Sequence, residues 1–148
     1  MRLRCFFRAT LAIAVFIQLD VAATPLRTTS PKYQYEPMVS TLKGVLRSRV
    51  YPGPPNYESV KKGDEAEGVW ILKLSHSISV EGDKDPTSFN ERETGIREVQ
   101  VIFKDGEEKM VKRQMGKPIE CTGTLFHAHT GHHHLALLLD VQNYKSYK

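Results

Sequence analysis

The stretch VWILKLSHSISV, residues 69–80, constrains the fold more than any other part of the sequence. From Trp70 to Val80 every second position is apolar except His76, and serines alternate with these positions in the second half. Alternation with a period of two is typical of a β-strand that has one face in a core. The stretch therefore predicts a long strand, with His76 on its inward face.

Similar alternation predicts four more strands. They cover residues 38–50, 96–106, 117–128 and 133–144. Gly44 interrupts the first of them, where a bulge or sharp bend is expected, and residues 107–116 are the one good helix candidate. Three strands, a helix and two strands follow the order of an OB-type barrel. We predict a mainly β fold: a small five-stranded OB-like barrel with one short helix between strands 3 and 4. Another small half-open β-barrel or a sandwich is the alternative.

Residues 1–23 have the pattern of a secretory signal peptide. Arginines precede a short apolar run, and Val21 and Ala23 are small residues where a signal peptidase cleaves. We predict cleavage after Ala23, a periplasmic or secreted protein, and no membrane span in the mature chain. Residues 24–37 lack apolar periodicity and are predicted to lead into a single domain over residues 38–148.

Charge and cysteine content exclude a nucleic-acid partner and an internal disulfide. The formal net charge is +4, and cleavage removes three Arg and one Asp, which leaves +2. This mild excess, without a dense Lys/Arg run, does not predict nucleic-acid binding. Cys5 leaves with the signal peptide, so Cys121 is the only mature cysteine. Its place in an alternating strand predicts a buried core residue rather than a nucleophile.

Five of the six histidines lie within residues 127–134. A three-residue turn over residues 129–131, with Gly131 left-handed, would direct the apolar residues of both flanking strands to one core. That register pairs His127 directly with His133. A two-residue turn would set the two apolar faces against each other, so we favour the three-residue turn.

His127, His129 and His133 are the candidate metal ligands. Directly opposed side chains lie about 5 Å apart at Cβ, a distance at which two imidazoles can share a zinc or copper ion. Histidine-rich tracts are only compositional signals, however, and we favour a structural or recognition role that requires no cofactor. Neighbouring imidazolium groups also repel one another, so this hairpin is expected to loosen in acid.

The segment YPGPPNYES, residues 51–59, is predicted to be a rigid recognition loop. Its prolines limit the entropy lost on binding, and its tyrosines supply contact area. The alternative is that this loop is rigid only because rigidity stabilises the fold. In an OB-type barrel the first long loop and the last hairpin border the usual ligand face, so we predict one binding surface from both. Its residues are Tyr51, Pro54, Asn56, Tyr57, Glu58, His132 and His134.

The motifs YEP, PGPPNYES, KGD, REVQVIF, GKPIECTGTLFHAHTGHHH and LLLDV occur in this order between residues 35 and 141. In this respect the chain resembles the bacterial exported family known as domain of unknown function 4431. The resemblance implies export and a single domain, and it implies no activity. Family members often carry cysteines near the start and after the second strand, whereas KYQYEP and LSHSISVEGD have none here.

No nucleophile elbow, phosphate loop or paired-cysteine zinc motif occurs, so nothing in the sequence supports an enzyme. The sequence instead predicts a small exported binding module that recognises a protein partner in the cell envelope. An inhibitor or immunity-type protein, directed against an envelope-targeting enzyme or toxin, would suit its size and stiff loops. A periplasmic metal-binding protein that uses the histidine-rich hairpin is the alternative.

Overall fold

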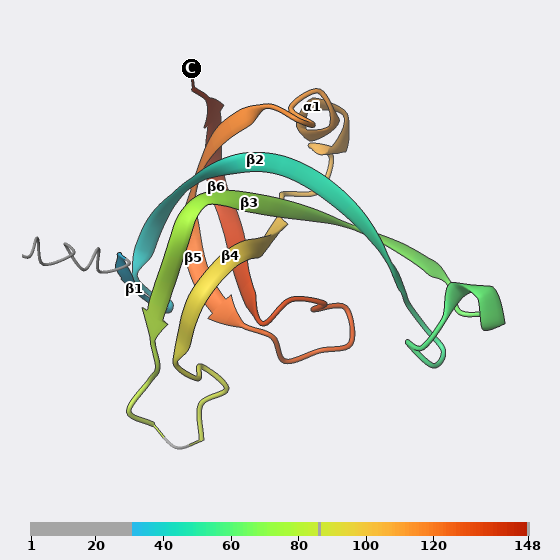
Figure 1. Ribbon diagram of the computed structural model, residues 1–148, viewed down its shortest axis with the longest axis horizontal. Helices are drawn as coiled ribbons and strands as arrows, with labels where there is room; N and C mark the ends of the chain where they lie inside the picture. The colour runs from blue at the N-terminus through green and yellow to red at the C-terminus, as the bar shows by residue number, and fades with distance from the viewer. Residues whose placement is uncertain (1–30, 86, 148) are drawn as a thin grey trace, which may run out of the picture.

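The computed structural model describes residues 31–85 and 87–147, so the predicted signal peptide lies outside the described residues. The chain is mainly β, as predicted, and its regular elements follow one another along the sequence (Figure 1). They are β1 (Lys32–Gln34), β2 (Val39–Pro52), the 3₁₀ turn η1 (Val60–Lys62), β3 (Ala66–Glu81), β4 (Glu93–Ile102), α1 (Glu108–Lys112), β5 (Pro118–His127) and β6 (Leu137–Ser146).

All six strands belong to one sheet, in the order β1-β3-β2-β5-β6-β4. Because β3 also pairs with β4, the five longer strands form a closed ring of pairings. The β4–β6 pair is parallel and the other four pairs of the ring are antiparallel. β1 joins β3 in parallel outside this ring. The predicted lead-in, residues 24–37, therefore includes β1, which is too short to show a periodic pattern.

The core lies on the inner face of the ring, where the alternation in β3 places it. Leu72, Ile78 and Val80 are each at most 1% exposed, so the long strand predicted for residues 69–80 is confirmed. His76, however, is exposed, and its predicted inward position is wrong. The β3–β4 register shifts between Lys73 and Ile78, and His76 lies within this irregularity.

Cys121 is fully buried in β5, as its place in the alternating strand predicts. Burial raises the pKa of its thiol to about 12, with a smaller contribution from the negative charge of Glu120. A thiol in this environment stays protonated at neutral pH and is a packing group rather than a nucleophile.

Gly44 allows β2 to curve over the core. A Cβ atom at this position would overlap the main-chain carbonyl oxygen of Lys73 on β3, and it would lie 3.0 Å from Leu72 Cγ. Glycine is therefore required here by the close approach of two strands, at the position where the sequence predicts a bend.

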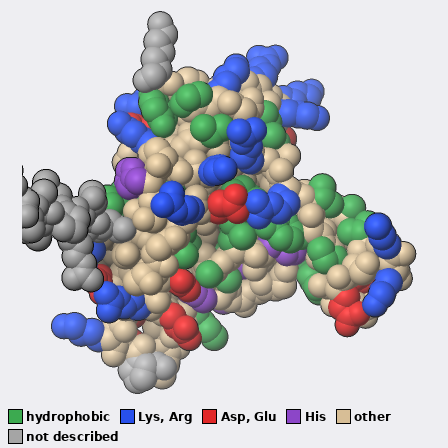
Figure 2. Space-filling model, viewed as in Figure 1, with side chains coloured by type: hydrophobic (Ala, Val, Ile, Leu, Met, Phe, Trp, Pro, Cys, Tyr) green, Lys and Arg blue, Asp and Glu red, His purple; other side chains and the backbone are tan. Residues whose placement is uncertain are grey.

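Beyond this bend, β2 and β3 leave the ring together. β2 pairs with β5 only as far as Val45, but its pairing with β3 continues to Pro52. We call residues 48–69 the arm, which ends in a loop over residues 53–65. Figures 1 and 2 show it projecting from the body as a separate lobe, and Figure 1 shows α1 above its base and the β5–β6 connection below.

Replacing Gly44 with Ala is expected to lower the free energy of unfolding by about 2 kcal/mol, because the added methyl group must push β2 and β3 apart. The matched control is Gly68→Ala on the arm, where a Cβ atom has nothing within 4 Å. Urea unfolding of both variants measures the difference, and equal losses would show that the close approach at Gly44 is unimportant.

Candidate functional site

The β5–β6 connection is much longer than the sequence predicts. The ladder closes with the Ala128 N–H donating to the Ala136 carbonyl at 3.0 Å, and we call residues 128–136 the histidine loop. His127 pairs with Leu137, so the predicted three-residue turn and the pairing of His127 with His133 are wrong. From Gly123 to His127, odd positions still pair with odd positions, as in Leu125 with Leu139, which keeps both apolar faces in one core.

The side chain of Gln100 explains why the ladder stops early. This β4 residue is 5% exposed, and its amide donates to the His132 carbonyl at 3.0 Å and accepts from the His134 N–H at 2.8 Å. These two bonds satisfy main-chain groups that a longer hairpin would satisfy between its strands. The histidine loop is thus fastened to β4 rather than folded back on itself.

Glu67 fastens the same loop to the arm. One carboxylate oxygen lies 2.7 Å from His132 Nδ1 and the other lies 3.1 Å from His134 Nε2. Burial by itself would raise the pKa of Glu67, but hydrogen bonds and charge from the two histidines outweigh it, so this pKa lies below its ordinary value. Behind the carboxylate, the rings of His134 and Tyr51 stack at 4.5 Å with an interplanar angle of 3°.

A third contact joins the tip of the arm to the histidine loop. Tyr57 has a φ of 59°, a left-handed conformation that is rare for a bulky residue and costs on the order of 1–3 kcal/mol. Its ring lies edge-on to His132, with centroids 5.8 Å apart. A Cβ atom at residue 131 would come within 2.8 Å of this ring, so Gly131 is needed for packing. The prediction of a left-handed Gly131 is wrong, because its φ is not positive.

Asp64 holds the loop at the tip of the arm in one conformation. Its carboxylate accepts hydrogen bonds from the main-chain N–H groups of Asn56, Glu58 and Ser59 at 2.7–3.0 Å, and from the Asn56 side-chain amide at 3.1 Å. The pKa of Asp64 is lowered, chiefly by the Ser59 hydrogen bond and against the effect of burial. This loop is therefore ordered by an internal acceptor as well as by its prolines.

The structure brings the predicted binding residues of both loops together. The exposed members are Asn56, Tyr57, Glu58 and His132. The half-buried members, which support them from beneath, are Tyr51, Pro54 and His134. We call this set, together with Glu67, the two-loop surface.

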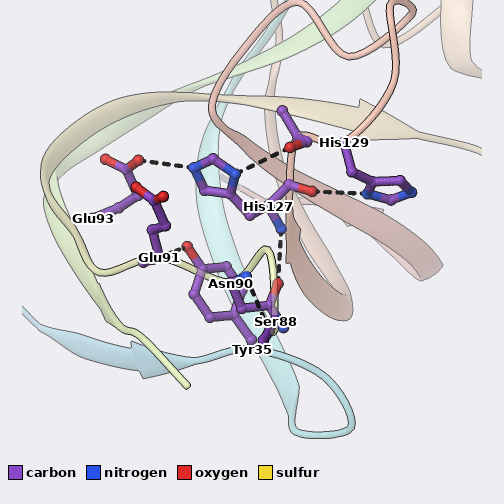
Figure 3. Close-up of polar contacts among 8 residues, drawn as sticks. Tyr35, Ser88, Asn90, Glu91, Glu93, His127 and His129 are labelled. Atoms are coloured by element: carbon purple, nitrogen blue, oxygen red, sulfur yellow. Dashed lines mark hydrogen bonds and ion pairs between the residues drawn. The ribbon is translucent and has the colours of Figure 1, made fainter. Parts of the chain in front are cut away.

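The other side of the histidine loop rests on the β3–β4 loop (Figure 3). The Nε2 atom of His127 lies 3.1 Å from a Glu93 carboxylate oxygen, and its main-chain N–H donates to the Asn90 side-chain carbonyl at 3.2 Å. Phe89, which is 71% exposed, faces the ring of His129 at 6.3 Å. An exposed aromatic residue thus borders the histidine loop on this side, as Tyr57 does on the other.

The three candidate metal ligands do not converge. The ring of His127 is directed at Glu93, whereas His133 Nδ1 accepts the main-chain N–H of His129 at 3.1 Å. Within residues 31–85 and 87–147, no three His, Cys, Asp or Glu side chains are grouped so that they could hold a metal ion. Metal binding therefore stays a prediction that this geometry does not favour.

Sequence reasoning missed four residues on which the site depends: Glu67, Asp64, Gln100 and Phe89. Glu67 and Asp64 lie in the charged run KKGDEAEG, where nothing distinguishes them from solvated neighbours. Gln100 occupies an outward position of an alternating strand, and such a position normally holds a solvated polar residue. Only the opposed histidine loop shows why a buried amide is needed there.

A family model described as "Domain of unknown function (DUF4431)" matches residues 98–145. The match runs from β4 to β6 and includes Gln100 and the whole histidine loop. This is the family that the sequence motifs resemble, and the match covers about a third of the chain. Comparison with curated proteins finds no match. Among the described residues, no helix is long and apolar enough to cross a membrane.

Replacing Glu67 with Ala is expected to lower the free energy of unfolding by about 1–2 kcal/mol, because two charge-assisted hydrogen bonds are lost together. It should also speed amide exchange in both loops. Glu98→Ala is the matched control, since Glu98 forms an exposed ion pair with Arg49 at 2.9 Å whose loss should cost less. Urea unfolding measures the loss of stability, and hydrogen exchange measures the opening of each loop. Faster exchange in only one of the two loops would contradict the view that Glu67 holds them together.

The histidine loop should lose stability below about pH 6.5. Burial lowers the pKa of His133 from its ordinary 6.5, and repulsion from His129, His132 and His134 adds to this. The unfolded chain therefore binds more protons, and the stabilisation is lost as pH falls through 6.5 toward the folded-state pKa. In His133→Asn, which keeps an acceptor near the position of Nδ1, unfolding free energy should fall less between pH 7.5 and 5.5. An equal fall would rule out His133 as the cause.

Proposed function

We propose that this protein is a small exported binding module that recognises a protein partner through the two-loop surface. The ring of five strand pairings, read as an OB-like barrel, supplies a rigid support for the first long loop and the last connection, which border the usual ligand face of such barrels. Cleavage after Ala23 would deliver the mature domain to the periplasm or beyond.

The observation that carries this proposal is the double contact of Glu67 with His132 and His134, which makes one continuous surface from two loops. The arm and the histidine loop are held by hydrogen bonds before any partner arrives, so little conformational entropy remains to be lost on binding. Exposed aromatic residues border the surface, and tyrosine and histidine are well suited to protein contacts because each combines a ring with a polar group.

The partner we favour is a hydrolytic enzyme or toxin that acts on the cell envelope, with the protein serving as inhibitor or immunity factor. Enzyme clefts are concave, and a narrow lobe that carries a stiff loop can enter such a cleft as protease inhibitors do. The arm has this form, since it projects beyond the ring and ends in a loop fixed by Asp64.

The test is affinity capture from native envelope extract with the mature protein as bait. We expect to capture a partner that, once purified, binds the wild-type protein saturably and is inhibited by it. Its affinity for a Tyr57→Ala/His132→Ala double variant should be at least about tenfold lower. His76→Ala is the control, because His76 is exposed on β3 outside both loops.

Two results would contradict the proposal. One is a partner that binds the double variant as tightly as the wild type, which would put recognition elsewhere. The other is a combined result: no protein partner binds saturably, and the purified protein still includes residues 1–23. Together these findings would contradict both recognition of a partner and export.

A further inference from the structure

We propose that the cleft between α1 and the base of the arm binds a small ligand that carries a flat apolar ring and an anionic group, either a carboxylate or a phosphate. The cleft lies on the face of the arm opposite the histidine loop, so this site does not rest on the proposed protein partner. Its volume is about 550 Å³, within the range of small-molecule sites.

The base of the arm and Trp70, which follows the arm in β3, supply an apolar floor. Ser48 and Trp70 are directly paired across β2 and β3, and the next pair on the same face is Val50 with Gly68. Trp70 packs partly against the core but remains half-exposed, and Val50 is 64% exposed. Beside the indole, a Cβ atom on Gly68 would meet nothing within 4 Å. A flat ring can therefore lie against Trp70 over the glycine without displacing any side chain.

The helix supplies the charge. Lys109 and Lys112 line the cleft, and neither forms an ion pair within the part of the chain that the structure describes. The one acidic group of the lining, Glu108, accepts the Gly106 N–H at 3.1 Å. Residues 104–117 carry five Lys/Arg and three Asp/Glu, and basic side chains gather where α1 lies in Figure 2. An anionic group on the ligand would meet these ammonium groups at the rim while its ring covers Trp70.

The sequence contains a single tryptophan, so one indole N–H signal in a ¹⁵N NMR spectrum reports directly on the cleft. The probes are 2-naphthoate and 2-naphthyl phosphate, with the neutral isostere 2-naphthamide as the reference. We expect saturable shifts of the Trp70 signal with at least one anion, and binding of the amide about fivefold weaker. The tighter of the two anions identifies the preferred group.

Three variants separate binding at the cleft from a general effect. Gly68→Val should fill the cleft and abolish the shift while the remaining spectrum stays folded, because the added side chain has open space. Lys109→Ala/Lys112→Ala should bring naphthoate and naphthamide to equal affinity. Lys61→Ala/Lys62→Ala, on η1 at the tip of the arm, should leave the preference unchanged. No saturable shift with either anion, equal binding of the amide to wild type, or a shift that survives Gly68→Val would overturn the proposal.

Discussion

The carboxylate of Glu67 contacts His132 and His134, which lie 65 and 67 positions further along the chain. Without it, the arm would be a two-stranded ribbon outside the ring, and isolated two-stranded ribbons are at best marginally stable. The histidine loop, nine residues without regular structure, would keep its Gln100 bonds to β4 but lose its hydrogen bonds to the arm. Because Glu67 accepts from His132 and His134 at once, each segment supplies the order that the other lacks.

The remaining contacts add to this junction in a definite arrangement. Gln100 holds the main chain of the histidine loop to β4, the ring of Tyr51 on the arm stacks on that of His134, and His127 joins the start of the loop to Glu93. These supports come from three directions, so the loop keeps one conformation while several of its rings stay accessible. Pre-organisation of this kind lowers the entropy that binding would cost, which supports the proposed recognition of a partner.

Much of the fold could be predicted from the sequence, because strand alternation is a local signal. Residues 69–80 have the predicted strand with most of the predicted inward residues, and the order of strands along the chain follows the same patterning. The closure of the ring as a barrel of OB type stays an interpretation of its pairings. The errors lie where a non-local contact decides the outcome. Residues 129–131 suggested a three-residue turn, but Gln100 binds the main chain of the loop and Glu67 binds two of its imidazoles.

The same reasoning explains why the candidate site was only partly predictable. Tyr57 and His132 were recognisable because aromatic and imidazole side chains in stiff loops are distinctive in a sequence. Their supports were not, because one glutamate in a charged run and one glutamine in a strand look like ordinary surface residues until the opposing loop is known. His76 failed for a related reason, since a register shift against β4 has no signature within β3 itself.

We propose that the histidine loop and the tip of the arm form one surface that a partner covers as a unit. Hydrogen–deuterium exchange of the mature protein, measured free and in complex with its captured partner, tests this most directly. We expect slowed exchange in residues 53–65 and 128–136 together, with the strands of the ring unchanged. Protection confined to one of these loops, or found only on the opposite face of the arm, would contradict it.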